Sequence, residues 1–160
     1  MIDARCRYVV RSCGGAIPAL CLLMAALGCA GPTVEPGKAE ADLQREIRKS
    51  DVILHPRGSG PFPAVILLHG CSGPTTRDQA WAERLREWGY LTLRVNSLAA
   101  RGLKRVCGGG ILGTEQRVPD MLAALARIRE REDVRVDRVA LLGWSHGGGA
   151  TLQALAAAPE

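Results

Sequence analysis

One short motif, Gly143-Trp144-Ser145-His146-Gly147, constrains the fold of this chain more than any other feature. It directly follows the apolar run 139–142 and directly precedes an alanine-rich segment. Placed between a buried strand and a helix, Gly-x-Ser-x-Gly is the pattern of a nucleophile elbow, a sharp turn that exposes its serine. Gly143 and Gly147 fit such a turn because neighbouring backbone comes too close for a Cβ. The motif therefore predicts Ser145 as a nucleophile in an α/β fold, and the alternative is a glycine-rich turn with an unreactive serine.

The rest of the chain alternates between short apolar runs and helical patterns. We expect strands at 52–55, 64–68, 90–95 and 139–142, and helices at 76–89, at 118–131 and from near residue 147. Strands that alternate with helices indicate an α/β fold with a parallel sheet and right-handed crossovers. The runs 65–68 and 139–142 are apolar at consecutive positions, which predicts strands buried on both faces of the sheet.

A second turn, His69-Gly70-Cys71-Ser72-Gly73, follows the strand predicted at 64–68. Because the carboxyl ends of parallel strands line the site in α/β sheets, we expect this turn to lie beside Ser145. The backbone amides of Cys71 and His146 are then the candidate donors of an oxyanion hole, which stabilises charge that develops on a carbonyl oxygen. The long glycine-rich connection 96–117 is also a candidate part of the site.

With both turns in place, the stretch from Gly60 to about Ala156 resembles the α/β-hydrolases and, within them, the dienelactone hydrolase-like group. The resemblance rests on 61–65, on the 69–73 turn, on 81–90 and on 136–148. It implies a three-layer αβα sandwich and hydrolysis of an ester, lactone or thioester bond through an acyl-enzyme on Ser145. The namesake enzymes use cysteine at this position, so serine points to esterase-like members and a small-molecule ester-like substrate. This chemistry needs no cofactor and no metal.

The base and acid of a catalytic triad are missing from the pattern. In this fold the triad runs Ser, then Asp or Glu, then His along the chain. After His146 the sequence contains neither Asp nor His and ends at Glu160, a poor candidate. His69 and His146 are weak candidates for the base, and His55 is expected at a strand end. We therefore expect the N-terminal part of a hydrolase without its C-terminal strands, in which the strand at 139–142 would be an unpaired, hydrophobic edge. The alternative is a non-catalytic envelope-associated remnant or binding module.

The first 28 residues have the pattern of a secretory signal, because basic residues precede the apolar run 16–27 and small residues follow it. The segment 26–29 resembles a bacterial lipobox, which makes Cys29 a candidate for lipidation; cleavage near Ala30 is the alternative. We expect an exported protein, either periplasmic or attached to a bacterial membrane through Cys29. Residues 29–50, rich in Pro, Gly and charge, are predicted as a tether with a short helical tendency, and 51–160 as the partial hydrolase domain.

Cysteine usage and charge narrow the remaining function classes. Four of the six cysteines lie in the first 29 residues, which leaves Cys71 and Cys107 as a candidate disulfide or as two free thiols. The three histidines are scattered and form no zinc pattern. The net charge of +5 is spread without a basic block, so the sequence predicts no nucleic-acid partner. The oligomeric state is open.

Overall fold

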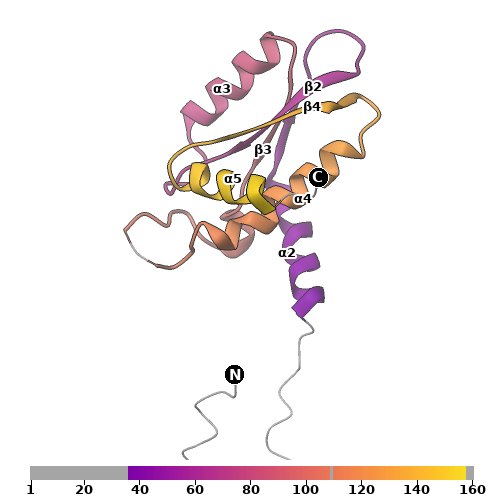
Figure 1. Cartoon of the computed structure of the whole chain (residues 1–160). Helices are drawn as coiled ribbons and strands as arrows, with labels where there is room; N and C mark the ends of the chain where they lie inside the picture. Colours follow the sequence, from indigo (N-terminus) through magenta and orange to yellow (C-terminus); the bar gives the residue numbers. More distant parts are fainter. Residues whose placement is uncertain (1–35, 109, 158–160) are drawn as a thin grey trace, which may run out of the picture. The chain divides into compact units, whose positions relative to one another are not determined.

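The computed structural model describes residues 36–108 and 110–157 (Figure 1). The predicted signal 1–28, the candidate lipidation site Cys29 and the first residues of the predicted tether lie outside this range. Within the described residues, no helix is both long and apolar enough to cross a membrane.

Four strands form one sheet in the order β1-β3-β2-β4. They are β1 (Val52–Leu54), β2 (Phe62–Leu68), β3 (Leu91–Val95) and β4 (Val134–Gly143). β2 pairs in parallel with β3 and with β4, as the alternation of strands and helices predicts. β1 differs from the all-parallel expectation because it pairs with β3 antiparallel. The chain enters β1 beside the end of β3, where the Asp51 carboxylate accepts a hydrogen bond from the Asn96 amide at 3.0 Å.

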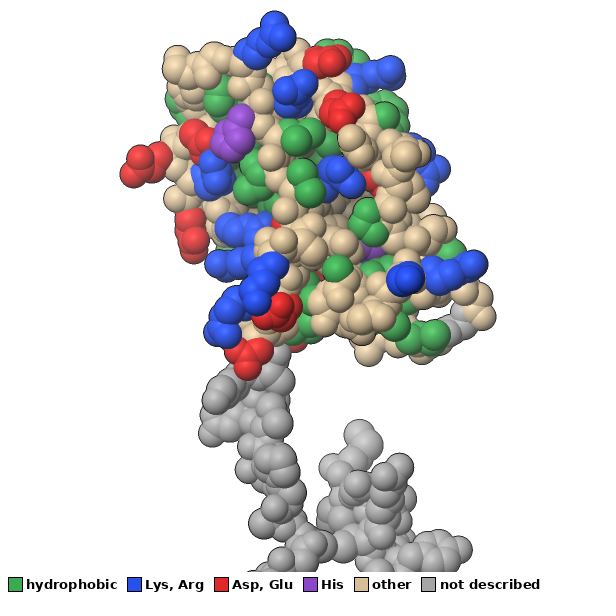
Figure 2. All heavy atoms as spheres, turned by 180° about the vertical axis from the view of Figure 1, so that it is seen from behind, with side chains coloured by type: hydrophobic (Ala, Val, Ile, Leu, Met, Phe, Trp, Pro, Cys, Tyr) green, Lys and Arg blue, Asp and Glu red, His purple; other side chains and the backbone are tan. Residues whose placement is uncertain are grey.

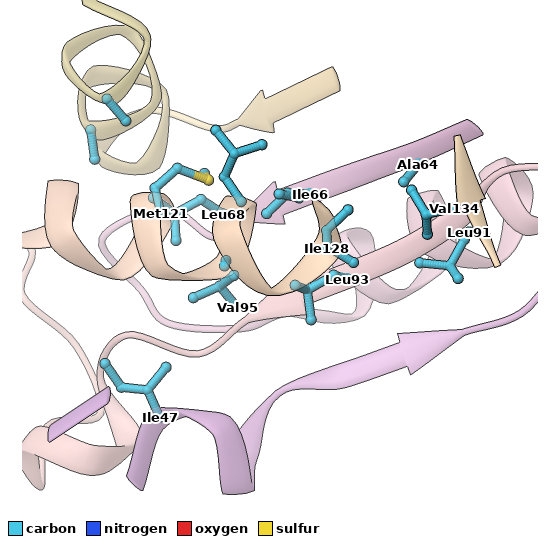
Figure 3. Packing of buried hydrophobic residues seen from close by; sticks show 14 residues of the cluster. Ile47, Ala64, Ile66, Leu68, Leu91, Leu93, Val95, Met121, Ile128 and Val134 are labelled. Atoms are coloured by element: carbon cyan, nitrogen blue, oxygen red, sulfur yellow. The ribbon is translucent and has the colours of Figure 1, made fainter. Parts of the chain in front are cut away.

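Helices cover both faces of the sheet (Figure 1). On one face, α3 (Thr76–Glu87) packs against Val65 and Leu67 of β2 through a small buried cluster. On the other face, α4 (Val118–Arg129) and α5 (His146–Ala157) pack against Ala64, Ile66 and Leu68 in the main core (Figure 3). Alternate residues of β2 therefore point into opposite layers, as the two-residue period of a strand requires, and the layers form an αβα sandwich.

The segment predicted as a tether is in part a packed helix. α2 (Pro36–Ser50) has Ile47 in the main core at 2% exposure, with Leu43 packed against the same cluster. These two residues stand four apart, so they share one helix face while charged residues occupy the others. The prediction of a tether over 29–50 is therefore wrong for 36–50, because one apolar face is sufficient to dock a highly charged helix.

The strand predicted at 139–142 is longer and less buried than expected. β4 is at the edge of the described sheet, and Val136, Ala140 and their neighbours are exposed or half-buried. β2 has a similar apolar run but lies between two strands, and its residues from Ala64 to Leu68 are all buried. The expectation of full burial on both faces therefore holds for β2 and is wrong for β4, which has the edge position that the sequence also allowed for it. On the face shown in Figure 2, basic side chains are interspersed with acidic and apolar ones.

Candidate active site

Ser145 occupies a strained turn between β4 and α5. Its φ of 49° lies in the left-handed region, and it is the one non-glycine residue with positive φ in the described chain. A side chain in that region costs about 1 kcal/mol or more, so neighbouring structure has to hold it there. Ser145 is also exposed, whereas Gly147 and Ala150 just after it are buried. The turn thus presents the serine hydroxyl to solvent at the carboxyl end of a sheet strand.

The two glycines of the motif allow this turn to pack. A Cβ on Gly147 would lie 2.3 Å from the carbonyl oxygen of Leu68 and 2.4 Å from that of His69. A Cβ on Gly143 would lie 2.4 Å from the Gly147 carbonyl oxygen. All of these clashes are with backbone, which cannot move aside as a flexible side chain would. The sequence expectation that neighbouring backbone excludes a Cβ at both positions matches these distances.

The turn at 69–73 lies beside the serine. The Trp144 amide donates to the Leu68 carbonyl at 3.2 Å, which continues the β2–β4 pairing into both turns. A Cβ on Gly70 would lie 3.8 Å from the Ser145 Cβ, so the turn faces the serine side chain directly. Parallel pairing brings these turns together although they are more than seventy residues apart in the sequence.

The two amides predicted as oxyanion donors have no acceptor within the described residues. The amide of His146 is the first of α5, where the helix geometry leaves it without an intrahelical partner and adds the positive end of the helix dipole. The amide of Cys71 lies in the turn that faces Ser145. Two unoccupied N–H groups on adjacent turns can together bind an anionic oxygen.

A disulfide joins the 69–73 turn to the glycine-rich connection. Cys71 and Cys107 are bonded, and the Val106 amide donates to the Cys71 carbonyl at 2.7 Å. Leu98, Val106 and Leu112 form a small buried cluster against the half-buried Cys71. The connection also contains two short 3-10 helices, Ala99–Arg101 and η3 (Glu115–Arg117). It is therefore a packed element that contacts the turn rather than a free loop.

Neither nearby histidine is placed to act as a base. His146 has Arg117 Nη1 3.1 Å from its Nδ1 and the Leu112 carbonyl oxygen 3.0 Å from its Nε2, so both ring nitrogens are engaged. The Nδ1 of His69 donates to the Gly70 carbonyl at 2.7 Å. Burial, followed by the positive charge of Arg117, lowers the pKa of His69 to about 4. His55 directly follows the last residue of β1, as expected of a strand end, and its Nδ1 lies 3.4 Å from Oδ2 of Asp133.

The described residues give Ser145 no general base. Its Oγ makes no hydrogen bond with any histidine or carboxylate in the described part of the chain. The rings of His69 and His146 are instead hydrogen-bonded to other groups. A cavity of about 70 Å³ is lined in part by His69 of the adjacent turn, and Ser145 does not line it. Among 36–108 and 110–157, no cluster of three or more His, Cys, Asp or Glu residues is arranged to hold a metal.

The sequence did not point to Arg117 as part of this site. Arg117 contacts His69, 48 positions away in the sequence, and His146, 29 positions away.

Comparisons with known proteins agree with this architecture, although no family model matches the chain. Esterase EstD of Thermotoga maritima is 35% identical over 104 residues, which are 59% of this chain and 24% of that protein. The solved 2,6-dihydroxy-pseudo-oxynicotine hydrolase superposes with a TM-score of 0.55 at 25% identity, over 68% of this chain and 30% of the other. A Klebsiella pneumoniae protein described as a dienelactone hydrolase superposes with a TM-score of 0.52 at 18% identity, over 61% and 45%.

The chain has the α/β-hydrolase fold. The resemblance noted in the sequence and the predicted fold class are thereby confirmed. The chain spans less than half the length of each of these three proteins. Similarity to an esterase and to other hydrolases supports a hydrolase-type function at this coarse level.

Proposed function

We propose that this chain carries the nucleophile and the oxyanion hole of a serine hydrolase that acts on an ester, lactone or thioester bond. Ser145 Oγ attacks the acyl carbonyl, the alcohol or thiol leaves, and water then releases the acyl group from the serine. The amides of Cys71 and His146 stabilise the tetrahedral oxyanion. The observation that carries the proposal is the exposed, strained Ser145, with φ of 49°, held between two positions that exclude a Cβ.

The proton of Ser145 needs an acceptor that this proposal places on a further segment. The chain has three histidines, and His69 and His146 have their ring nitrogens turned to other partners. We therefore propose that a His–Asp pair beyond these residues completes the triad, in the chain order typical of this fold. The EstD similarity, which covers only a quarter of that esterase, is compatible with such a missing part.

One observation favours a second function. Ser145 has no base within the described residues, so a non-catalytic binding module at the cell envelope would have the same geometry. In that case the two free amides would hold an anionic or carbonyl group of a ligand without bond cleavage. The two functions differ in whether Ser145 becomes covalently modified.

A fluorophosphonate probe distinguishes them. Applied to the native gene product from the membrane fraction of its host, the probe is expected to label Ser145, as shown by mass spectrometry of the labelled peptide. Ser145→Ala abolishes labelling, whereas Ser72→Ala, an exposed serine in the adjacent turn, leaves it intact. A folded native product without any label would count against the hydrolase and favour the binding module.

The intact mass of that same preparation tests the remaining expectations. We propose export and lipidation at Cys29, and a polypeptide longer than these 160 residues. A mass above that of residues 29–160 plus acyl chains supports the completed triad, and the added sequence is then expected to contain the Asp and the His. A mass equal to residues 29–160 plus acyl chains would support the lipoprotein and the binding module together. A mass without lipid would overturn the anchor.

A further inference from the structure

Arg117, at the end of η3, is the largest fully buried side chain of the described residues, and it pairs with no carboxylate there. The nearby Asp120 instead binds Arg101, at 2.7 and 3.0 Å. A buried cation without an anionic partner is costly, and burial lowers the pKa of Arg117 to about 10. An apolar side chain of similar size would pack there at less cost. The position therefore calls for a role beyond filling the core.

The partners of Arg117 belong to the two turns of the candidate site. Its Nη2 donates to the main-chain carbonyl of His69 at 3.1 Å and lies 3.4 Å from the nitrogens of that ring. Its Nη1 lies 3.1 Å from Nδ1 of His146. One planar guanidinium thus bridges the oxyanion turn and the first residue of α5.

The bridge fixes the proton position on the ring of His146. Arginine only donates hydrogen bonds, so Nδ1 of His146 has to accept from Arg117. The carbonyl of Leu112 only accepts, so Nε2 of His146 has to carry the proton that it shares at 3.0 Å. These two contacts select the neutral Nε2–H tautomer. They also tie the glycine-rich connection to the elbow through the same ring.

The ring of His69 orients the other candidate amide. Its Nδ1–H donates at 2.7 Å to the carbonyl of Gly70, which also accepts from the Gly73 amide at 3.3 Å. That carbonyl and the Cys71 amide belong to one planar trans peptide, in which C=O and N–H point in opposite directions. Holding the Gly70 oxygen therefore aims the Cys71 N–H away from the His69 ring.

We propose that Arg117 is a positioning residue that sets the two oxyanion amides relative to one another. Through the His69 carbonyl it holds the turn that carries the Cys71 amide, and through the His146 ring it holds the residue that supplies the second amide. It touches neither substrate nor Ser145. The catalytic meaning of this arrangement rests on the proposed function, whereas the arrangement of protons is independent of it.

The proton positions are measured directly by long-range ¹H–¹⁵N correlation spectra of the full chain labelled with ¹⁵N-histidine. At pH 7 we expect His146 in the Nε2–H tautomer and His69 in the Nδ1–H tautomer. The same chain unfolded in urea supplies the reference for rings that average between tautomers. A wild-type spectrum of the folded chain with His146 averaged as in the unfolded chain, or protonated on Nδ1, would overturn the proposal without any variant.

Arg117→Met and Arg117→Lys test whether the arginine selects these states. In Arg117→Met, His146 is expected to populate both tautomers and the amide resonances of Cys71 and His146 to move. Lysine keeps the charge but cannot span two acceptors with a planar fork, so an intermediate result is expected. Arg127→Met is the matched control, because it removes a partly buried arginine that pairs with Asp51 away from both turns. A folded Arg117→Met protein with wild-type tautomers and amide shifts would contradict the proposal.

The labelling rate of Ser145 by the fluorophosphonate gives the catalytic readout. We expect Arg117→Met to slow labelling of the folded native product by roughly tenfold to a hundredfold, since small displacements of preorganised donors have effects of that size. Arg127→Met is expected to label at the wild-type rate. Equal rates in Arg117→Met and wild type would refute the positioning role. If wild type itself does not label but the tautomers are as expected, the hydrolase proposal fails and the bridge stands.

Discussion

The two sides of Ser145 differ sharply in how they are held. One side, here called the held side, consists of the turn 69–73, Arg117 and the disulfide. The backbone there is so close that a Cβ on Gly147 would lie 2.4 Å from the carbonyl oxygen of His69. The other side, the open side, consists of the free edge of β4 and the outer face of α5. No described strand pairs with that edge, and Leu152 and Leu155 are 70% and 65% exposed.

This difference separates two requirements of acyl transfer. Stabilising an oxyanion needs donors fixed before the reaction, and the held side provides two oriented amides with several independent constraints. Moving the serine proton needs a base, and the described residues provide none on either side. The described residues can therefore supply the donors that an oxyanion needs, whereas the proposed function assigns proton transfer to a further segment.

The largest expected effect comes from breaking the held side at Gly147. Gly147→Ala forces a Cβ into the backbone oxygens of Leu68 and His69, and we expect a loss of about 4 kcal/mol in the free energy of unfolding, or failure to fold. Gly148→Ala is the matched control in the same helix, because its Cβ comes no closer than 3.2 Å to the Gly143 oxygen. Urea denaturation of both variants measures the difference. Equal stability of the two would contradict the close-packing argument.

Removing the disulfide is expected to have the next largest effect. The double variant Cys71→Ser/Cys107→Ser opens a loop of 36 residues, which lowers the free energy of unfolding by about 3 kcal/mol. The variant keeps the hydrogen bond from the Val106 amide to the Cys71 carbonyl and the packing of Leu98 and Leu112. The turn should therefore keep its place in the folded state. We expect labelling of Ser145 in the folded variant to slow less than about threefold. A collapse of labelling in folded protein would show that the disulfide itself positions the Cys71 amide.

The sequence predicted the site's two turns and offered Cys71 and Cys107 as a candidate disulfide, but it did not predict the arginine that bridges the turns. The glycine spacing of 143–147 and the apolar runs before each turn are local patterns, and local geometry places both turns at neighbouring strand ends. Arg117 could not be predicted in the same way. A buried arginine has no sequence signature, and its partners His69 and His146 are distant in the chain.

Two local features were predicted incorrectly for physical reasons. The spacing of Thr76 and Gln79 in the sequence is that of a capping box at the start of α3, but the box is formed one residue earlier by Thr75 and Asp78. The short Asp78 carboxylate accepts a hydrogen bond from the Thr75 amide at 2.6 Å. The segment 36–50 has the helical tendency expected of it but is packed rather than a tether, because Leu43 and Ile47 dock it on the main core. In the first case two overlapping pairs, Thr75/Asp78 and Thr76/Gln79, both have the spacing of a capping box. In the second case the two apolar residues that dock the helix are outnumbered by charged ones.

Acid should weaken the held side through His69. Burial and Arg117 lower its pKa from 6.5 to about 4, so as pH falls the unfolded chain takes up the proton before the folded chain does. The stability that neutral His69 contributes is present above pH 6.5 and is lost progressively towards pH 4, up to about 3 kcal/mol. Urea midpoints at pH 7 and pH 4.5 measure this loss. His69→Gln, which cannot be protonated, should reduce the difference, and an unchanged difference would exclude His69 as its source.

The smallest effect on stability, and the sharpest test of the open side, comes from Leu152 and Leu155. Replacing both by Gln keeps good helix formers on α5 and removes exposed apolar surface, so the free energy of unfolding should change by less than about 0.5 kcal/mol. Because exposed apolar patches bind hydrophobic dyes and promote association, we expect lower dye fluorescence and less self-association in light scattering. Ile111→Gln is the control, since Ile111 is 67% exposed but lies in the glycine-rich connection on the held side. Equal dye binding by the double variant and wild type would mean that Leu152 and Leu155 do not form the apolar surface of this chain, and the contrast between the two sides would then rest on the unpaired edge of β4 alone.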